Sequence, residues 1–155
     1  MNNIHDLTDE QLSYVVRYAP LVSIDLIIRD PEGRVLVALR RNEPAKNCYF
    51  VPGGRIRKNE TIDAAFQRIL RAETSLKFGF ERARLLGVYQ HIYPTNRFEH
   101  EDYGTHYVVL AYEMSLRERP RVTLDDQHDS WKWMNEHELR SAPEVHEFVK
   151  RYFGG

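Results

Sequence analysis

The sequence predicts a single α/β domain in which a mixed sheet is covered by helices on both faces. Alternating apolar residues predict strands at 22–29 and 35–41, and apolar residues at helical spacing predict a helix that begins after Thr61. Strands and helices are intermixed along the chain, as in domains built from packed layers. A chain of 155 residues is long enough to bury its own core, so we expect one domain over residues 1–155.

The composition is that of an ordinary soluble protein. Hydrophobic residues make up 42% and charged residues 29% of the chain, and the formal net charge is −1. No overall field therefore favours nucleic acid or a membrane as a partner. Cys48 is the only cysteine, which excludes an intramolecular disulfide, and residues 1–12 lack the pattern of a secretory leader. These features favour a cytoplasmic protein.

The first third of the chain predicts a helix followed by a hairpin. Thr8 and Gln11 have the spacing of a capping box, which predicts a first helix at about 9–18. The two strands that follow are joined at 30–33 by Asp-Pro-Glu-Gly, a sequence typical of tight turns. Asp25 is unusual because it places a carboxylate between apolar strand residues. A structural aspartate whose carboxylate is satisfied by hydrogen bonds would explain this position without a functional role.

The second half of the chain predicts further strands and a last helix. Strands are expected at 83–93 and 105–116, and the polar loop 94–104 between them has the length of a lid or binding loop. A short aromatic strand at 130–134 follows. Pro143 is expected to start a final amphipathic helix. The residues predicted to face inward from this helix are Val145, Phe148, Val149 and Tyr152.

Residues 50–75 organise the chain. A short extended segment ends at Gly53-Gly54 and leads into the basic loop 55–59. Thr61 suits the N-cap of the helix that follows, because its hydroxyl accepts from a backbone N–H of the first turn. The apolar stripe of this helix consists of Ile62, Ala65, Phe66, Ile69 and Leu70.

Glu73 does not fit the pattern of this helix. It falls within the apolar stripe and near the C-terminus of the helix, where the macrodipole disfavours a carboxylate. An ionised glutamate on a buried face is costly unless a cation meets it. A fraying last turn or a salt bridge to an arginine explains it, and so does a metal ion shared with the backbone of Gly53-Gly54. The helix pattern alone leaves these interpretations open.

The spacing of Gly54, Glu60, Arg68 and Glu73 resembles the Nudix box, which here would cover about residues 54–76. The Nudix box is the loop–helix signature of hydrolases that act on nucleoside diphosphates linked to another group. The resemblance implies a Nudix α/β/α sandwich with a mixed central sheet.

Three positions depart from the usual box. Ile69 and Ala72 stand where two further glutamates are usual, and Ser75 stands where a glycine is usual. Loss of these carboxylates, with the rest of the box kept, resembles the GDP-mannose mannosyl hydrolase family. The resemblance covers nearly the whole chain, and the segments that carry it outside the box are 20–25, 50–55, 90–91, 105–110 and 126–129.

The family resemblance implies Mg²⁺-dependent hydrolysis of GDP-mannose, and also of GDP-glucose, to GDP and free sugar. Water would attack the anomeric carbon with inversion. The partner is therefore a small-molecule nucleotide sugar, and the resemblance also implies a homodimer. Two alternatives stay open. One is a conventional nucleotide-sugar pyrophosphatase that releases GMP and sugar phosphate, and the other is a domain that binds nucleotide sugar without hydrolysing it.

The resemblance assigns one Mg²⁺ per active site, which Mn²⁺ can replace, to Glu73, the Gly53 carbonyl and Gln127. Mg²⁺ prefers oxygen ligands and keeps waters and substrate phosphates around it. Because this ligand set carries a single negative charge, the ion would mainly clamp the leaving diphosphate.

With the carboxylate cluster depleted, another group must activate water. His128 is the implied general base, since an unperturbed imidazole pKa of about 6.5 suits proton transfer near neutral pH. His91 and His100 are the alternative bases. Taken alone, Gln127 and His128 also fit a solvated turn within the polar run 125–130.

Negative charge that develops on the leaving group needs fixed cations nearby. Arg55 and Arg40 are the candidates for this catalytic role and for substrate binding, and Arg68 is expected to orient Glu73 or a neighbouring group. The resemblance assigns further substrate contacts to Asp25, His91 and Tyr107. The other basic residues near the box receive no role, because surface arginines and lysines are usually solvated: Arg41, Arg57, Lys58 and Arg71.

Overall fold

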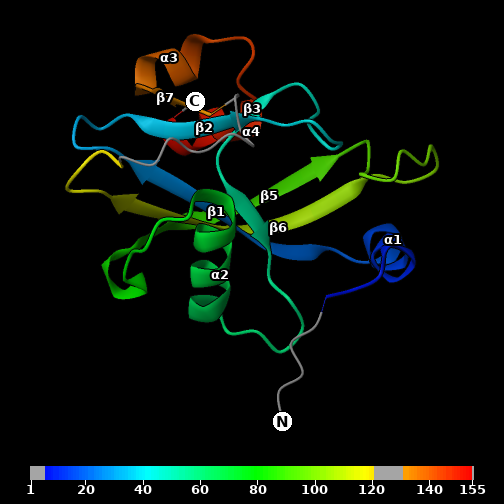
Figure 1. The fold of residues 1–155 in the computed structure, drawn as a ribbon. Coiled ribbons are helices and arrows are strands. Elements are labelled where there is room, and N and C mark those ends of the chain that lie inside the picture. The colour runs from blue at the N-terminus through cyan, green and yellow to red at the C-terminus, as the bar shows by residue number, and fades with distance from the viewer. Residues whose placement is uncertain (1–5, 121–130, 155) are drawn as a thin grey trace.

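The computed structural model describes residues 6–120 and 131–154, which form a seven-stranded sheet with helices on both sides (Figure 1). The strands are β1 (Leu21–Arg29), β2 (Val35–Leu39), β3 (Tyr49–Phe50), β4 (Gly53–Arg55), β5 (Arg84–Tyr93), β6 (Thr105–Ser115) and β7 (Lys132–Met134). The helices are α1 (Asp9–Tyr18), α2 (Ile62–Thr74), α3 (Glu136–Ser141) and α4 (Glu147–Lys150), with 3₁₀ turns at Phe80–Arg82 and Arg151–Phe153. None of these helices is long and apolar enough to cross a membrane.

β1 is the centre of the sheet, whose strand order is β3-β2-β1-β6-β5. It runs parallel to β6 along its whole length, from Leu21 beside Tyr107 to Arg29 beside Ser115. β2 and β4 pair with β1 in the antiparallel sense, and β7 extends the sheet beside β2. The predicted hairpin of the first two strands and the predicted mixed sheet are therefore confirmed.

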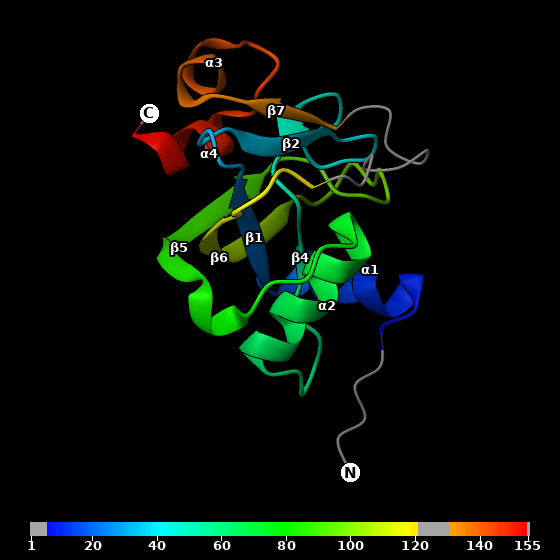
Figure 2. The ribbon, with the colours of Figure 1, turned by 60° about the vertical axis from the view of Figure 1, so that its left-hand side comes forward.

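Alternate residues of β1 contribute to two separate cores. Leu26 lies in the core beneath α2 together with Phe66, whereas its neighbour Ile27 lies in the core beneath the C-terminal segment together with Phe148. All four side chains are buried. Figure 2 shows the same layers from the side, with α2 on one side of the sheet and α4 on the other. This layering confirms the predicted α/β/α arrangement.

The last helix begins later than the sequence predicts. Residues 143–146 are not helical, and α4 begins at Glu147 with the His146 side chain as its N-cap. The reason is tertiary: the Tyr49 amide donates to the Glu144 carbonyl at 2.8 Å, and the His146 amide donates to the Tyr49 carbonyl at 3.2 Å. These bonds hold the backbone around Val145 extended beside β3. The four predicted inward-facing residues are nevertheless buried.

α2 closely matches its prediction. Thr61 is its N-cap, and its hydroxyl accepts from the Ala64 amide at 3.3 Å. Of the predicted apolar stripe, Ala65, Phe66, Ile69 and Leu70 are buried. Ile62 is the exception, because it is the first residue of the helix, lies outside the core beneath it and is 43% exposed.

Ser75 ends α2 in the left-handed conformation, with φ 61° and ψ 9°. Its amide donates to the Arg71 carbonyl at 2.9 Å and so closes the last turn. A side chain makes this conformation unfavourable by about 1–2 kcal/mol, whereas glycine adopts it readily. The serine that replaces the usual glycine of the box therefore costs stability at this position.

We expect Ser75→Gly to raise the free energy of unfolding by about 0.5–1 kcal/mol, because the relief of strain exceeds the added entropy of the unfolded chain. Urea unfolding measures this difference. Ser75→Ala is the matched control, since alanine keeps the strained side chain and should give no comparable gain. An equal gain from both substitutions would contradict the explanation.

Candidate active site

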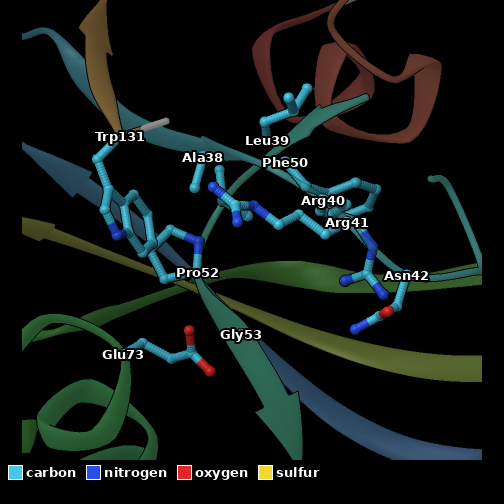
Figure 3. Close-up of a pocket in the computed structure, with 11 residues that line it drawn as sticks. Ala38, Leu39, Arg40, Arg41, Asn42, Phe50, Pro52, Gly53, Glu73 and Trp131 are labelled. Carbon is cyan, nitrogen blue, oxygen red and sulfur yellow. The ribbon is translucent and has the colours of Figure 1, made fainter. Parts of the chain in front are cut away.

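The predicted site residues gather where the end of α2 meets β4 and the chain that follows β2. A cavity of about 330 Å³, the Glu73 cavity, has Glu73, Gly53, Arg40, Asn42 and Trp131 among its lining residues. In Figure 3 the carboxylate of Glu73 extends from α2 toward Gly53, and arginine and asparagine side chains lie across the cavity. A carboxylate and several cationic groups therefore face one space.

Two further cavities adjoin the Glu73 cavity and share residues with it. The arginine cavity, of about 430 Å³, is lined by Arg40, Arg55, Glu73 and Tyr107, among others. The Asp25 cavity, of about 80 Å³, lies beside Asp25, and Arg40 lines it as well. The structure thus brings together these predicted residues: Asp25, Arg40, Gly53, Arg55, Arg68, Glu73, His91 and Tyr107. Gln127 and His128 lie outside the described residues.

Close backbone contacts explain the two glycines of β4. Asp25 is the partner of Gly53 in the pairing of β1 with β4. A Cβ atom on Gly53 would lie 2.5 Å from Asp25 Oδ1 and 2.7 Å from the Ile24 carbonyl oxygen. A Cβ atom on Gly54 would lie 3.1 Å from the Ile69 side chain. The contact at Gly53 excludes any side chain, whereas the contact at Gly54 is tight but would need only a small shift of Ile69. The backbone of Gly53 lines the Glu73 cavity.

Two box positions that usually carry glutamate have other roles here. Ile69 is 2% exposed and packs in the core beneath α2, and Ala72 is exposed to solvent. Within the described part of the chain, no group of three or more His, Cys, Asp or Glu residues is arranged to hold a metal ion. Glu73 is half-buried and is the carboxylate of the box that reaches the cavity.

A single hard cation fits the donors that are present. Glu73 supplies one carboxylate, and Gly53 lines the same cavity with its backbone. One carboxylate and backbone oxygen suit a Mg²⁺ or Mn²⁺ ion that completes its coordination with water and phosphate oxygens. The donors do not suit a soft metal, because Cys48 lines none of these cavities.

Arg68 holds the loop between β4 and α2. Its guanidinium donates to Glu60 from Nε at 2.7 Å and from Nη2 at 2.9 Å, and Nη2 also donates to the Arg55 carbonyl at 2.8 Å. This bidentate pair lowers the pKa of the Glu60 carboxyl. Glu60 also accepts from the Arg57 amide at 3.0 Å. Arg68 therefore fixes both the end of β4, which carries Arg55, and the loop that follows it.

Asp25 lies at the junction of the sheet and the C-terminal segment. The Tyr152 hydroxyl donates to Asp25 Oδ2 at 2.5 Å. Burial raises the pKa of Asp25 to about 7, although the Tyr152 hydrogen bond and the Arg40 charge both lower it. The helical pattern of the sequence predicts only a core position for Tyr152. The two residues are 127 positions apart, so no local pattern links them.

His91 is an aromatic core residue as well as a lining residue of the Asp25 cavity. It is 3% exposed, and its ring stacks on Phe148 with a centroid distance of 4.6 Å. Its Nε2 lies 3.3 Å from the Tyr152 hydroxyl. Burial, together with the nearby charges of His146 and Arg151, lowers the pKa of His91 to about 4. His91 is therefore neutral at neutral pH.

The loop 94–104 has a fixed structure built around Asn96, a residue that the sequence analysis did not identify. Asn96 is fully buried, and its amide group donates to the carbonyls of His100 and Tyr103 at 2.8 and 2.7 Å. His100 lines a different cavity, of about 380 Å³, beside Glu43. The structure does not bring His100 to the Glu73 cavity.

Comparison with known proteins gives consistent matches. The NUDIX domain model matches residues 19–153. The low-salt glycan biosynthesis protein Agl8 of Haloferax volcanii is 36% identical over 146 residues, covering 94% of this chain and 88% of that protein. The ADP-ribose pyrophosphatase of Methanocaldococcus jannaschii is 37% identical over 70 residues, covering 45% of this chain and 40% of that protein.

Solved structures share the fold. The MutT NUDIX hydrolase of Burkholderia pseudomallei has a TM-score of 0.66 and 26% identity, covering 87% of this chain and 96% of that chain. The NUDIX domain of Shewanella oneidensis NrtR, solved with ADP ribose, has a TM-score of 0.63 and 17% identity, covering 94% of this chain and 96% of that chain. At the lower identity the likeness shows the fold alone.

The pKa of His91 predicts a pH dependence of stability. Between pH 4 and 6.5 the unfolded chain binds a proton at this position that the folded chain does not, so His91 makes stability rise with pH. In His91→Gln this contribution is absent. The difference in unfolding free energy between wild type and variant should increase by about 3 kcal/mol from pH 4 to 6.5.

Urea unfolding at several pH values measures this difference. Asp25 contributes a slope of the opposite sign between pH 4 and 7, because its raised pKa makes the folded chain bind the extra proton. That contribution is present in both proteins and cancels in the comparison. His137→Gln, at an exposed position, controls for loss of a histidine. A pH-independent difference would contradict a buried, neutral His91.

Proposed function

Because this chain belongs to the NUDIX family and is a Nudix hydrolase, we propose that it hydrolyses GDP-mannose, and also GDP-glucose, to GDP and free sugar. The match over residues 19–153 supports a divalent-metal hydrolase that acts on a small nucleotide-derived molecule. The name of the Haloferax volcanii relative refers to glycan biosynthesis, which supports a substrate that contains a sugar.

The burial of Ile69 is the observation that carries this proposal. Its side chain fills the core against Gly54 at a position where a Nudix enzyme that attacks phosphorus usually has a metal-binding glutamate. Among residues 6–120 and 131–154 no cluster of acidic groups joins Glu73, and one carboxylate offers too little negative charge to hold several divalent ions close together. A site of this kind favours clamping of the diphosphate as a leaving group over generation of a metal hydroxide, and so favours attack at the sugar carbon.

The charges around the cavities suit the departure of GDP. Arg40 and Arg55 both line the arginine cavity, and a hydrogen bond from Arg40 Nε to the Pro44 carbonyl at 2.8 Å fixes one guanidinium. Preorganised cations offset charge that develops on a leaving group without having to reorient during the reaction. Glu73, the Gly53 carbonyl and Gln127 would hold one Mg²⁺ or Mn²⁺, which supplies further neutralisation of the diphosphate when bound.

The remaining residues are proposed to hold the substrate and move the proton. Asp25, His91 and Tyr107 line the Asp25 cavity beside Arg40, which supports a role for them in contacting the substrate. His128 would take a proton from water on the face of the anomeric carbon opposite the diphosphate. Displacement in line converts the α-linked sugar to the β-anomer.

We propose a cytoplasmic homodimer as the working form. Leu85, Val88 and Ile92 are 48%, 60% and 58% exposed, and all lie on β5 at the end of the strand order. Apolar side chains along an edge strand favour association with another sheet.

A product assay tests the function. With GDP-mannose and Mg²⁺, we expect GDP and mannose, with the β-anomer seen first by NMR. GMP and mannose 1-phosphate would show a conventional pyrophosphatase, which the partial match to an ADP-ribose pyrophosphatase favours as the alternative. Binding of GDP-mannose without products would show a ligand-binding domain.

Glu73→Gln is the matched variant for this assay. It removes the carboxylate and keeps the shape of the side chain. We expect activity to fall about 100-fold or more, because loss of groups that only orient metal ligands already costs about 10–100-fold. Thermal unfolding should stay near that of the wild type. Glu10→Gln, at an exposed position on α1, should keep full activity. Near-normal turnover by Glu73→Gln would refute the metal assignment.

His128→Ala tests the base. Loss of general-base help should lower kcat about 10²–10⁴-fold. Binding of Mn²⁺, measured by electron paramagnetic resonance, should be retained, because His128 is not a proposed ligand. In water enriched with ¹⁸O the label should enter the sugar. Label in GDP, or a larger loss from His91→Ala or His100→Ala, would show that the assignment is wrong.

A further inference from the structure

The arginine cavity holds a carboxylate that belongs to the chain itself. The side chain of Asp6 bridges two guanidinium groups: Oδ1 accepts from Arg55 Nη2, and Oδ2 accepts from Arg57 Nη2 at 3.2 Å. All three residues line the cavity, whose volume is about 430 Å³. Two arginines that share the two oxygens of one anion form the arrangement by which proteins bind phosphate groups.

Arginines outnumber carboxylates in the lining of this cavity, where Arg40, Arg55, Arg57, Arg68 and Arg97 stand against Asp6, Glu43 and Glu73. Arg40 and Arg97 also line it, and within residues 6–120 and 131–154 neither forms a salt bridge to a carboxylate. Arg68 lines it too but is committed to Glu60. The cavity is large enough for part of a nucleotide sugar, since small-molecule sites span about 300–1,000 Å³. Its chemistry is therefore that of a site for a polyanion.

We propose that Arg57 and Arg55 form a phosphate subsite for the diphosphate of the substrate, and that Asp6 competes with the substrate for this subsite. The proposal rests on the proposed function, because it takes the diphosphate of a nucleotide sugar as the anion. Arg57 thereby gains a role in binding substrate that its sequence position does not predict.

The position of Arg57 is suited to this role. Its amide is held by Glu60 at 3.0 Å, which in turn is held by Arg68, so the start of the loop is fixed while the guanidinium reaches the cavity. The Arg57 side chain is 30% exposed and that of Arg55 is 18% exposed. Removal of the Arg57 side chain therefore leaves the backbone bonds of the loop in place.

Asp6 is suited to compete with the substrate because its backbone is anchored while its side chain is held only weakly by the two arginines. Its side chain is 51% exposed, and ion pairs at such positions shift an equilibrium only about two- to sixfold. The chain next to it is anchored, since Thr8 caps α1 through a reciprocal pair of hydrogen bonds with Gln11. A tethered group acts at a high local concentration, yet a diphosphate with more charge and more acceptor oxygens displaces it.

Inorganic pyrophosphate is the probe that tests the subsite separately from the reaction. Its affinity, measured calorimetrically with Mg²⁺ present, does not depend on which bond of a nucleotide sugar the enzyme breaks. We expect Arg57→Gln to weaken pyrophosphate binding about 10-fold or more, because it removes a charge-assisted contact. Arg57→Lys should restore part of the affinity. The matched control is Lys58→Gln, at the adjacent exposed position, and should bind like wild type.

Asp6→Asn should strengthen pyrophosphate binding about two- to sixfold, because it removes the competing charge and keeps the shape of the side chain. In the Arg57→Gln background this gain in affinity should be smaller, because Asp6 and pyrophosphate then compete for one arginine instead of two. A gain of equal size in both backgrounds would show a general charge effect and overturn the competition.

Arg57→Gln with wild-type affinity, or Asp6→Asn with no gain, would likewise overturn the proposal. Thermal unfolding of each variant shows whether a lost affinity reflects a lost fold. If the product assay yields GMP and sugar phosphate while these affinities change as expected, the proposed reaction fails and the subsite stands. If the product assay yields GDP and free sugar while the affinities stay unchanged, the proposed reaction stands and the subsite is wrong.

Discussion

The close approach of β4 to β1 is the constraint on which the rest of the site depends. It puts the backbone of Gly53 against Asp25, with no space for a side chain between them. The same short strand delivers Arg55 into the arginine cavity, and the loop that follows leads to the start of α2. Gly53, Arg55 and the Glu73 side chain of α2 therefore all line the adjoining cavities around this strand.

Ile69 shows how a site can change its chemistry without changing its fold. The helix keeps its cap, its apolar stripe and its terminal glutamate, and the side chain of Ile69 adds to the core beneath it. Burial of an aliphatic side chain of this size stabilises a fold by about 1.5–3 kcal/mol. A carboxylate in its place would need a metal ion to balance its charge. At this position the chain therefore lacks a metal-binding charge and gains the stabilisation of a buried aliphatic side chain.

Local features were predictable from the sequence and long-range ones were not. The bounds of α1 and the apolar face of α2 follow from caps and spacing, which neighbouring residues determine. The start of α4 depends on Tyr49, whose backbone holds residues 144–146 extended from far away in the chain. The roles of Tyr152 and Asp6 depend in the same way on contacts between distant parts of the chain. Asn96 differs, because it bonds to residues four and seven positions away within its own loop.

The bond between Tyr152 and Asp25 joins the site to the last helical turn of the described chain. Asp25 sits on the central strand, and the hydroxyl that meets its carboxylate arrives only when the segment after α3 has packed against the sheet. Without the docked segment, water would solvate this carboxylate in place of the Tyr152 hydroxyl. The environment of a side chain on the central strand is therefore completed by the far end of the chain, and loss of the C-terminal segment would alter the site even if the sheet itself remained intact.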